Sequence, residues 1–308
     1  MKNINMKITL LLFLLTGSVS LQLCAQTDPL FNQYQFNQSM FNPAYTGTYN
    51  VFNGTLISRA QWAGIKGSPQ TTTFNASTAF FKDQLGAGLI VINDRIGISN
   101  NSDIQANFAY KLTFLHSHLS FGMQAGIVNY RYDYSNLTLE TDDQVLTQRQ
   151  RPNFSKPTIG AGMFYRADKY YLGISIPRLL DVSIQDDVTT NKIYKKQLYL
   201  SGGVVIDKFE GIKLKSTVLA MIQDSDRSYV DISASILLAE IIWAGIGTRN
   251  FTTYGANVML ELSNKFRIGY YYELPSSSLL GSTFGTNEVM LSADLEILKN
   301  HRALRRYF

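Results

Sequence analysis

Few side chains in this sequence have the types and spacing that catalysis or metal binding requires. The three histidines are His116, His118 and His301, and neither a catalytic-triad pattern nor metal-ligand spacing surrounds any of them. A metal site built on His116 and His118 would need further ligands, so an exposed turn is the simpler interpretation of that pair. The glycine pair Gly86-x-Gly88 is followed by neither a helix nor the Lys-Ser/Thr of a phosphate-binding loop. We expect no enzyme, no metal site and no cofactor.

The acidic runs at residues 142–143 and 224–226 are the remaining candidates for ligand chemistry. Their carboxylates could bind Ca²⁺, but they lack the regular spacing of the oxygen ligands in a calcium loop. Solvated acidic loops explain both runs better. Cys24 is the only cysteine in the sequence and lies in the N-terminal leader, so we expect neither a disulfide nor a Cys-based metal site in the mature chain.

The first 25 residues have the pattern of a secretory signal peptide. Lys2 and Lys7 provide the positive stretch, residues 8–15 form the apolar core, and small residues lead to an expected cleavage after Ala25. The apolar core is too short to span a bilayer as a helix. Lipidation of Cys24 is the less favoured alternative, because a small residue would normally precede that cysteine and a bulky leucine stands there.

The composition of the mature chain excludes several classes of protein. Loss of the leader's two lysines reduces the 28 basic residues to 26 against 23 acidic ones, and this net charge of +3 is too small for a nucleic-acid binder. Aromatic residues make up 12% and charged residues only 17%, yet the mature chain has no apolar run long enough for a transmembrane helix. An exported membrane protein of this kind fits a closed β-barrel, whose strands are only half apolar.

Fourteen segments alternate between apolar and polar residues with the period of two expected of β-strands. In the last of them, Val289, Leu291 and Leu295 share one face, and Glu288 and Asp294 share the other. Because about 9–11 residues suffice for a tilted strand to cross a membrane, we predict a single antiparallel transmembrane β-barrel. The predicted strands are residues 50–62, 70–81, 85–93, 103–114, 118–131, 157–167, 169–176, 196–207, 212–222, 229–238, 241–250, 252–262, 265–274 and 287–298.

The connections between the predicted strands alternate in length. Those after even-numbered strands are short, as at residues 167–169, whereas two of those after odd-numbered strands are long, at residues 133–156 and 177–195. Outer-membrane barrels have short periplasmic turns and long outer loops, so this parity predicts periplasmic termini. A soluble β-sandwich also has alternating strands, but it has no reason to sort its loops by parity. We expect the barrel at residues 50–298 and a basic, solvated periplasmic tail at residues 299–308.

The polar faces of the predicted strands would line the barrel lumen, and they carry charges of both signs. Apolar residues such as Ile90 and Ile92 lie among them. A wide porin would favour a hydrated polar wall, so this mixture predicts a lumen filled by side chains or by a plug. The charged residues assigned to the lumen are Lys111, Lys213, Lys215, Lys265, Arg267, Asp103, Asp231, Glu261, Glu273, Glu288, Asp294 and Glu296.

Residues 26–49, between the leader and the first strand, are too aromatic for a disordered tether. Asn42-Pro43 favours an extended or turn backbone, and Gly47 allows a turn before the barrel begins. We expect a plug-like N-terminal segment that packs into the lumen, with a binding or gating element as the sharper alternative. The candidate plug or partner-binding residues are Phe31, Gln33, Tyr34, Phe36, Asn42, Pro43, Tyr45 and Gly47.

The same segment resembles the PorP/SprF family of Bacteroidota outer-membrane proteins. Family members open with a pattern like Asp-Pro-x-Phe-x-Gln-Tyr-x-Phe-Asn, which residues 28–37 match, followed by Asn-Pro-Ala-Tyr-x-Gly, which residues 42–47 match. Later matches lie at Arg59-x-Gln61-Trp62 and at residues 86–97, 173–177 and 285–291. The chain departs from the family at Thr286-Asn287, where Ser-His is usual, and at Lys215, where proline is common.

This resemblance implies a non-enzymatic component of the type IX secretion and gliding machinery. One implied role, that of the SprF branch, is to assist surface delivery or anchoring of a large adhesin through the adhesin's C-terminal domain. The other, that of the PorP branch, is to attach periplasmic motor and ring proteins to the outer membrane. We favour the adhesin role because two long outer loops could grip a partner, and an uptake channel for a small solute is the alternative from another class. Expected partners are outer-membrane lipid, the adhesin domain, and the translocon or motor/ring proteins, and not nucleic acid.

Overall fold

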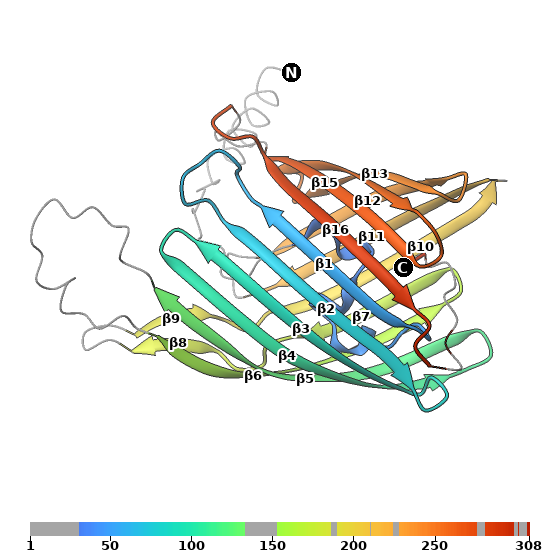
Figure 1. Ribbon diagram of the computed structural model, residues 1–308, viewed down its shortest axis with the longest axis horizontal. Helices are drawn as coiled ribbons and strands as arrows, with labels where there is room; N and C mark the ends of the chain where they lie inside the picture. The colour runs from blue at the N-terminus through green and yellow to red at the C-terminus, as the bar shows by residue number, and fades with distance from the viewer. Residues whose placement is uncertain are drawn as a thin grey trace, which may run out of the picture.

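The structure, a computed structural model, describes residues 31–132, 153–185, 190–209, 211–223, 228–275, 281–298, 301 and 307–308. Fourteen antiparallel strands close into a barrel, in which β1 pairs with both β2 and β16 (Figure 1). The barrel strands are β1 (Phe52–Ala60), β2 (Gln70–Phe80), β3 (Leu85–Ile96), β4 (Ser99–Thr113), β5 (Ser117–Tyr132), β6 (Phe154–Ala167), β7 (Tyr170–Ile176), β10 (Leu198–Phe209), β11 (Ile212–Ile222), β12 (Tyr229–Leu238), β13 (Ile242–Arg249), β14 (Thr253–Glu261), β15 (Phe266–Pro275) and β16 (Thr286–Leu295).

Each predicted barrel strand is present and differs from its predicted range by a few residues, so the prediction of a single antiparallel barrel is confirmed. The sequence did not predict the separate two-stranded sheet of β8 (Val182–Gln185) and β9 (Thr190–Tyr194), which lies in the long connection between β7 and β10. These strands have only four and five residues, too few for alternation to become visible.

Each barrel strand turns one apolar face outward and one largely polar face toward the lumen, because successive side chains of a pleated strand alternate. On β16, Val289 and Leu291 are 43% and 46% exposed, whereas Glu288 is fully buried. Leu291 lies opposite Leu56 of β1 and Ile268 of β15, so outward apolar residues continue from strand to strand. This band suits contact with lipid.

The charged residues assigned to the lumen lie there with two exceptions. Lys265 and Glu296 are exposed at the rim, where they form a surface ion pair of 3.5 Å. Lys213 and Arg267 are partly buried. The remaining eight are buried: Asp103, Lys111, Lys215, Asp231, Glu261, Glu273, Glu288 and Asp294.

The two ends of the barrel differ in their connections. The end we call the turn end carries the connections after β2, β4, β6, β10, β12 and β14, which are two to four residues long. The opposite loop end carries the longer ones, including the connection that contains β8 and β9. Two connections at the loop end are short as well. The β13–β14 connection has three residues, and β3 and β4 continue to a two-residue turn at Gly97, whose φ is +56°. Such a turn favours glycine.

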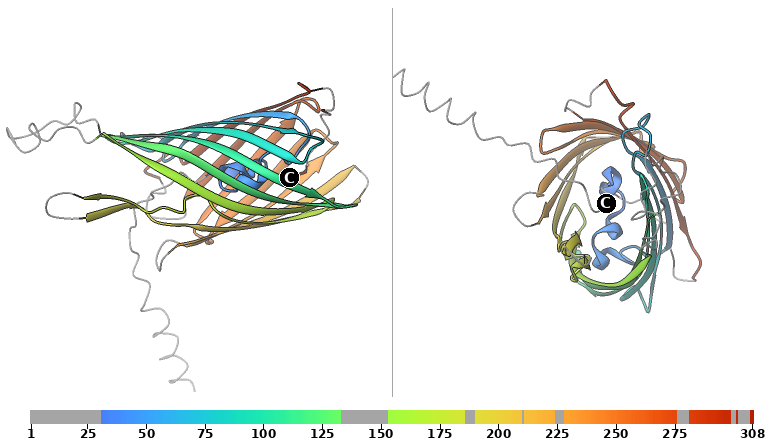
Figure 2. Two further views of the ribbon diagram at one scale, coloured as in Figure 1. Left: turned by 90° about the horizontal axis from the view of Figure 1, so that it is seen from below. Right: turned by 90° about the vertical axis from the view of Figure 1, so that its left-hand side faces the viewer.

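Residues 31–51 lie inside the barrel, where Figure 2 shows them enclosed by the strands. Tyr307 and Phe308 return to the turn end, and Phe308 is only 4% exposed. His301 is also buried, with its Nε2 3.0 Å from the carbonyl oxygen of Ala79. The expectation of a solvated tail is therefore wrong for His301 and Phe308, and Tyr307 is partly buried. In the part of the chain that the structure describes, no helix is long and apolar enough to cross a membrane.

Candidate functional site

The irregular structure inside the barrel is the lumen segment, which we define as residues 31–51. Its three short 3-10 helices are η1 (Asn32–Gln35), η2 (Gln38–Met40) and η3 (Pro43–Tyr45). Asn37 and Asn42 are the N-caps of η2 and η3, and each side chain accepts a hydrogen bond from the backbone N–H two residues later. Pro43 then occupies the first helical position, where its missing N–H leaves no hydrogen bond unmade. The segment thus encodes its own local turns.

A buried carboxylate of the wall binds the first turn of the segment. Glu288 on β16 accepts hydrogen bonds from the backbone N–H groups of Asn32 at 3.0 Å and Gln33 at 2.9 Å. Arg59 on β1 donates to the same carboxylate at 3.2 Å, and both charged side chains are at most 2% exposed. A buried charge is costly unless it is paired and hydrogen-bonded. The buried ion pair of Glu288 and Arg59 therefore fixes the position of η1.

A second carboxylate, Asp231 on β12, holds the neighbouring side of η1. Its partner Arg249 on β13 pairs with it at 2.8 Å and also donates to the side-chain oxygen of Asn32 at 2.7 Å. The Tyr34 hydroxyl donates to Asp231 at the longer distance of 3.4 Å. Glu273 on β15 lies 3.6 and 3.7 Å from the two arginines. Charged side chains from five strands thus form one network around η1.

Lys215 on β11 contacts the middle of the lumen segment and is 2% exposed. Its Nζ donates to the carbonyl oxygen of Gln35 at 3.2 Å and lies 3.8 Å from the ring centroid of Phe36. The Trp243 ring is 4.6 Å away, and its Nε1 donates to Glu261 at 2.8 Å. Aromatic faces attract a cation electrostatically, so these rings replace part of the hydration that burial removes.

Glycines in the wall let the segment approach the backbone of the strands. A Cβ at Gly122 of β5 would lie 2.1 Å from the backbone nitrogen of Ala44. A Cβ at Gly86 of β3 would lie 2.2 Å from the carbonyl oxygen of Thr46. Both distances are far below van der Waals contact, so any side chain at either position would displace the segment or the strand.

The turn-end part of the lumen segment is fixed by polar contacts and by a further glycine. Asn42 donates from Nδ2 to the carbonyl oxygen of Met163 on β6 at 3.0 Å, and Lys111 on β4 donates to that of Gly47 at 3.0 Å. Gly47 has a φ of +66°, and a Cβ there would lie 2.6 Å from the Cα of Gly86. Both the backbone conformation and the close approach therefore require glycine.

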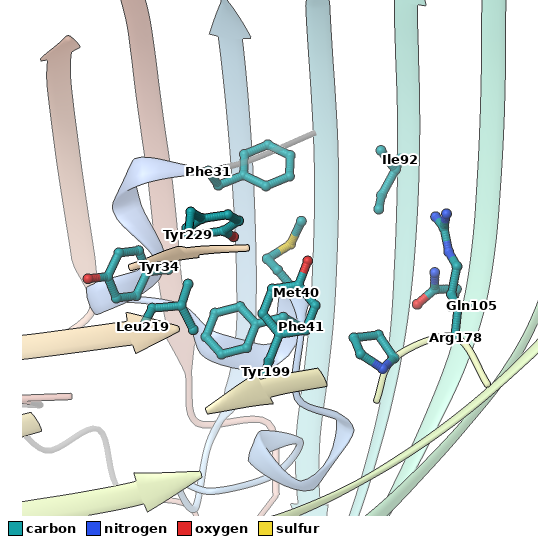
Figure 3. A pocket seen from close by; sticks show the side chains of 11 residues that line it. Phe31, Tyr34, Met40, Phe41, Ile92, Gln105, Arg178, Tyr199, Leu219 and Tyr229 are labelled. Carbon is teal, nitrogen blue, oxygen red and sulfur yellow. The ribbon is translucent and has the colours of Figure 1, made fainter. Parts of the chain in front are cut away.

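A small cavity of about 60 Å³ remains beside the segment (Figure 3). Phe31, Tyr34 and Phe41 of the segment line one side, and Gln105 and Arg178 line the other. One water needs about 10–15 Å³ of such space, so the cavity corresponds to a few water molecules and not to a wide path.

All eight residues predicted as plug or partner-binding candidates lie in the lumen segment. Seven of them are buried, and Phe36 is half-buried beside Lys215 and Trp243. Sequence reasoning missed the wall residues that hold the segment, although it had assigned several of their charges to the lumen. The missed contacts are those of Arg59, Gly86, Lys111, Gly122, Lys215, Asp231, Arg249, Glu273 and Glu288.

Sequence motifs far apart in the chain meet at this segment. Glu288, from the motif at residues 285–291, binds η1, and Arg59 pairs with it. Gly86, from the motif at residues 86–97, contacts the end of the segment. A family model described as type IX secretion system membrane protein PorP/SprF matches residues 23–293. The chain belongs to the PorP/SprF family. No curated protein sequence matches it significantly.

Several solved barrels are similar to this PorP/SprF protein. The CymD monoaromatic hydrocarbon channel matches with a TM-score of 0.52 and 10% identity, over 84% of this chain and 93% of that one. Omp33 of Acinetobacter baumannii matches with a TM-score of 0.47 and 7% identity, over 82% and 100%. The P. putida toluene transporter TodX matches with a TM-score of 0.46 and 10% identity, over 85% and 95%. At 10% identity the likeness to CymD concerns the fold alone.

The barrel fold and the family together fit the outer membrane and the type IX secretion machinery. No cluster of three or more His, Cys, Asp or Glu that could bind a metal occurs within the described ranges. His116 is exposed at the β4–β5 turn, 3.8 Å from Asp168, and the His118 Nδ1 lies 3.2 Å from the hydroxyl of Thr113. The expected signal peptide and both acidic runs considered for Ca²⁺ lie outside the described residues.

Proposed function

We propose that this PorP/SprF protein assists the surface delivery or anchoring of a large secreted adhesin by binding the adhesin's C-terminal domain. The observation that carries the proposal is the occupied lumen. The lumen segment crosses from Glu288, near the loop end of β16, to Lys111, near the turn end of β4. A barrel whose interior holds its own chain acts through its surfaces, because little space is left for a passing polypeptide.

The loop end offers a surface for binding the adhesin domain. The β8–β9 sheet extends the barrel there, and its Val182 and Tyr194 pack against Val128 and Tyr130 on the inner face of β5. The Arg178 guanidinium lies 4.7 Å from the Tyr194 ring centroid and adds a cation–π contact. In the orientation that the loop lengths predict, this sheet faces the cell exterior, where an exported adhesin would meet it.

The test replaces residues 182–194 with a short Gly-Ser linker and measures the adhesin on the cell surface by antibody labelling. We expect surface adhesin to fall while heat-modifiable mobility on a gel shows the barrel still folded. A matched control replaces residues 62–68 of the β1–β2 connection with a linker of the same length. Normal adhesin display in the β8–β9 variant would contradict the proposal.

Affinity purification from detergent-solubilised outer membranes separates the adhesin role from attachment of the periplasmic motor. Recovery of the adhesin domain with the wild type, and its loss with the β8–β9 variant, supports our proposal. Recovery of motor and ring proteins alone supports the PorP-like role. Planar-bilayer recording tests the occupied lumen itself: we expect poor conductance, and a large, stable conductance would favour an uptake channel.

A further inference from the structure

At the turn end of the barrel, Tyr307 and Phe308 occupy a contact site that is separate from the network around η1. We propose that it is a binding site for an aromatic residue pair of a peptide, which the protein fills with its own Tyr307 and Phe308. The proposal does not depend on the adhesin role, because it rests on the contacts of these two residues and on where they lie.

The site includes an apolar socket for the Phe308 ring. This residue is 4% exposed and lies in a cluster with Ala44, Phe164 and Val205. Its ring meets the Tyr171 ring edge to face, with centroids 4.9 Å apart. An aromatic side chain buries a large apolar area and gains from such a ring pair, so the socket selects for an aromatic side chain.

Hydroxyl groups fix the backbone of the same residue. Tyr45 and Tyr49 both donate to the backbone oxygen of Phe308, at 3.0 and 2.5 Å. Both tyrosines belong to the lumen segment, and the Tyr45 ring packs edge to face on Phe164 at 5.3 Å. Whatever occupies the socket therefore touches the lumen segment directly.

A third contact recognises the preceding residue. Lys213, at the start of β11, donates to the Tyr307 hydroxyl at 2.6 Å, and its Nζ lies 4.6 Å from the centroid of that ring. The lysine also pairs with Glu240 at 3.2 Å, which orients its side chain. Together the three contacts select a peptide that carries a hydroxyl-bearing aromatic residue followed by a second aromatic residue.

The location of this site determines which proteins can reach it. Its strand residues all lie close to the turn end, which the loop lengths assign to the periplasm. A periplasmic protein that presents an aromatic pair could replace Tyr307 and Phe308. Since socket and segment share Tyr45 and Tyr49, binding in the socket and docking of the segment must influence each other reciprocally.

The experiment uses the full barrel with only Tyr307 and Phe308 removed, refolded in detergent. Protease should cleave its lumen segment at least about tenfold faster than in the wild type, which corresponds to about 1.4 kcal/mol. The peptide Arg-Arg-Tyr-Phe should restore protection in a saturable way, whereas Arg-Arg-Ala-Ala should not. Heat-modifiable mobility checks that each sample is folded.

A full-length variant with Tyr45→Phe and Tyr49→Phe keeps the rings and removes both donors, so it tests the site even where the shortened chain fails to fold. We expect faster cleavage of its segment. A matched Tyr254→Phe variant, which loses an exposed hydroxyl that donates to the carbonyl oxygen of Phe251, should be unchanged. Wild-type protection in the folded shortened chain, equal effects of the two peptides, or an unaffected double-phenylalanine variant would each overturn the proposal.

Discussion

The barrel wall and the lumen segment are held by different physical means. In the wall, each strand pairs with two neighbours in a regular ladder, and the same alternation repeats around the barrel. The lumen segment has no ladder, and its three turns are held by side chains from different strands. A ladder of backbone hydrogen bonds tolerates many different side chains. A contact made by one side chain depends on the identity of that residue. The segment is therefore the part of the molecule in which individual residues matter most.

The distribution of charge also differs between the outward and inward faces of the wall. The outward face of β16 has Val289 and Leu291, whereas its inward face buries Glu288 and Asp294. Buried charges do not by themselves favour folding, because desolvation offsets their mutual attraction. The charges around η1 instead donate to or accept from the lumen segment, and they specify where it docks.

The largest expected effect comes from removing a wall charge that holds the segment. Glu288→Ala would leave Arg59 buried without its closest partner and would free two backbone N–H groups of η1. Loss of one member of a buried pair costs about 3–5 kcal/mol. We expect a loss of stability of that order, measured by urea titration in detergent, together with rapid proteolysis of the segment.

The matched control is Glu296→Ala, which removes a glutamate from the exposed pair with Lys265 at the rim. Exposed pairs contribute little, so this variant should behave like the wild type. Equal effects of the two substitutions would show that the buried network is not what separates the lumen segment from the wall.

An arginine on the outward face of a strand tests the contact of the wall with lipid. Val258 is an outward residue near the middle of β14 and is 47% exposed, whereas Leu262 lies just beyond the turn end of the same strand. Arginine on the lipid face costs about 2–4 kcal/mol at the bilayer midplane and much less at the interface. Val258→Arg should therefore reduce the yield of folding into lipid vesicles far more than Leu262→Arg. The reverse order would mean that the membrane lies elsewhere on the barrel.

A smaller effect should act on the segment and spare the wall. Gly122→Ala would place a Cβ 2.1 Å from the backbone of Ala44. Overpacking of this kind costs about 1–3 kcal/mol, and the segment yields before the closed ladder does. We expect faster protease cleavage of the segment with an unchanged heat-modifiable shift.

Gly54→Ala on β1 is the control for that substitution, because its Cβ would have a single neighbour at 3.7 Å. The control should leave cleavage of the segment unchanged. A barrel that unfolds with Gly122→Ala, while the segment stays protected in the remaining folded fraction, would contradict the independence of the two regions.

The sequence predicted the wall well because a period of two can be read locally. The fourteen barrel strands follow this period, whereas β8 and β9 are too short to display it. The tail was misjudged for a related reason. The basic residues near the end suggested solvation, but Tyr307 and Phe308 pack into the barrel.

The sequence predicted that the N-terminal segment would pack, but not what it would pack against. Its aromatic composition and its Asn and Gly positions are local features, and the structure gives them local roles as helix caps and as a turn. Its partners are remote: Asn32 and Glu288 are 256 residues apart in the chain. No periodic pattern connects such positions, so the contacts around η1 required the fold.

The smallest expected effect separates burial from hydrogen bonding within the segment. Tyr34 is 2% exposed and its ring packs edge to face on Phe41 at 6.3 Å, whereas its hydroxyl reaches Asp231 and Thr217 only at 3.4 Å. Tyr34→Phe keeps the ring and removes the long hydrogen bonds, so it should weaken docking by at most about 0.5–1.5 kcal/mol. Tyr34→Ala removes the buried ring as well and should cost several times more. Both values follow from the ratio of segment cleavage rates in the variant and the wild type. If Tyr34→Phe weakened docking as much as Tyr34→Ala, polar contacts and not ring burial would hold η1, and the segment would depend on the charge network alone.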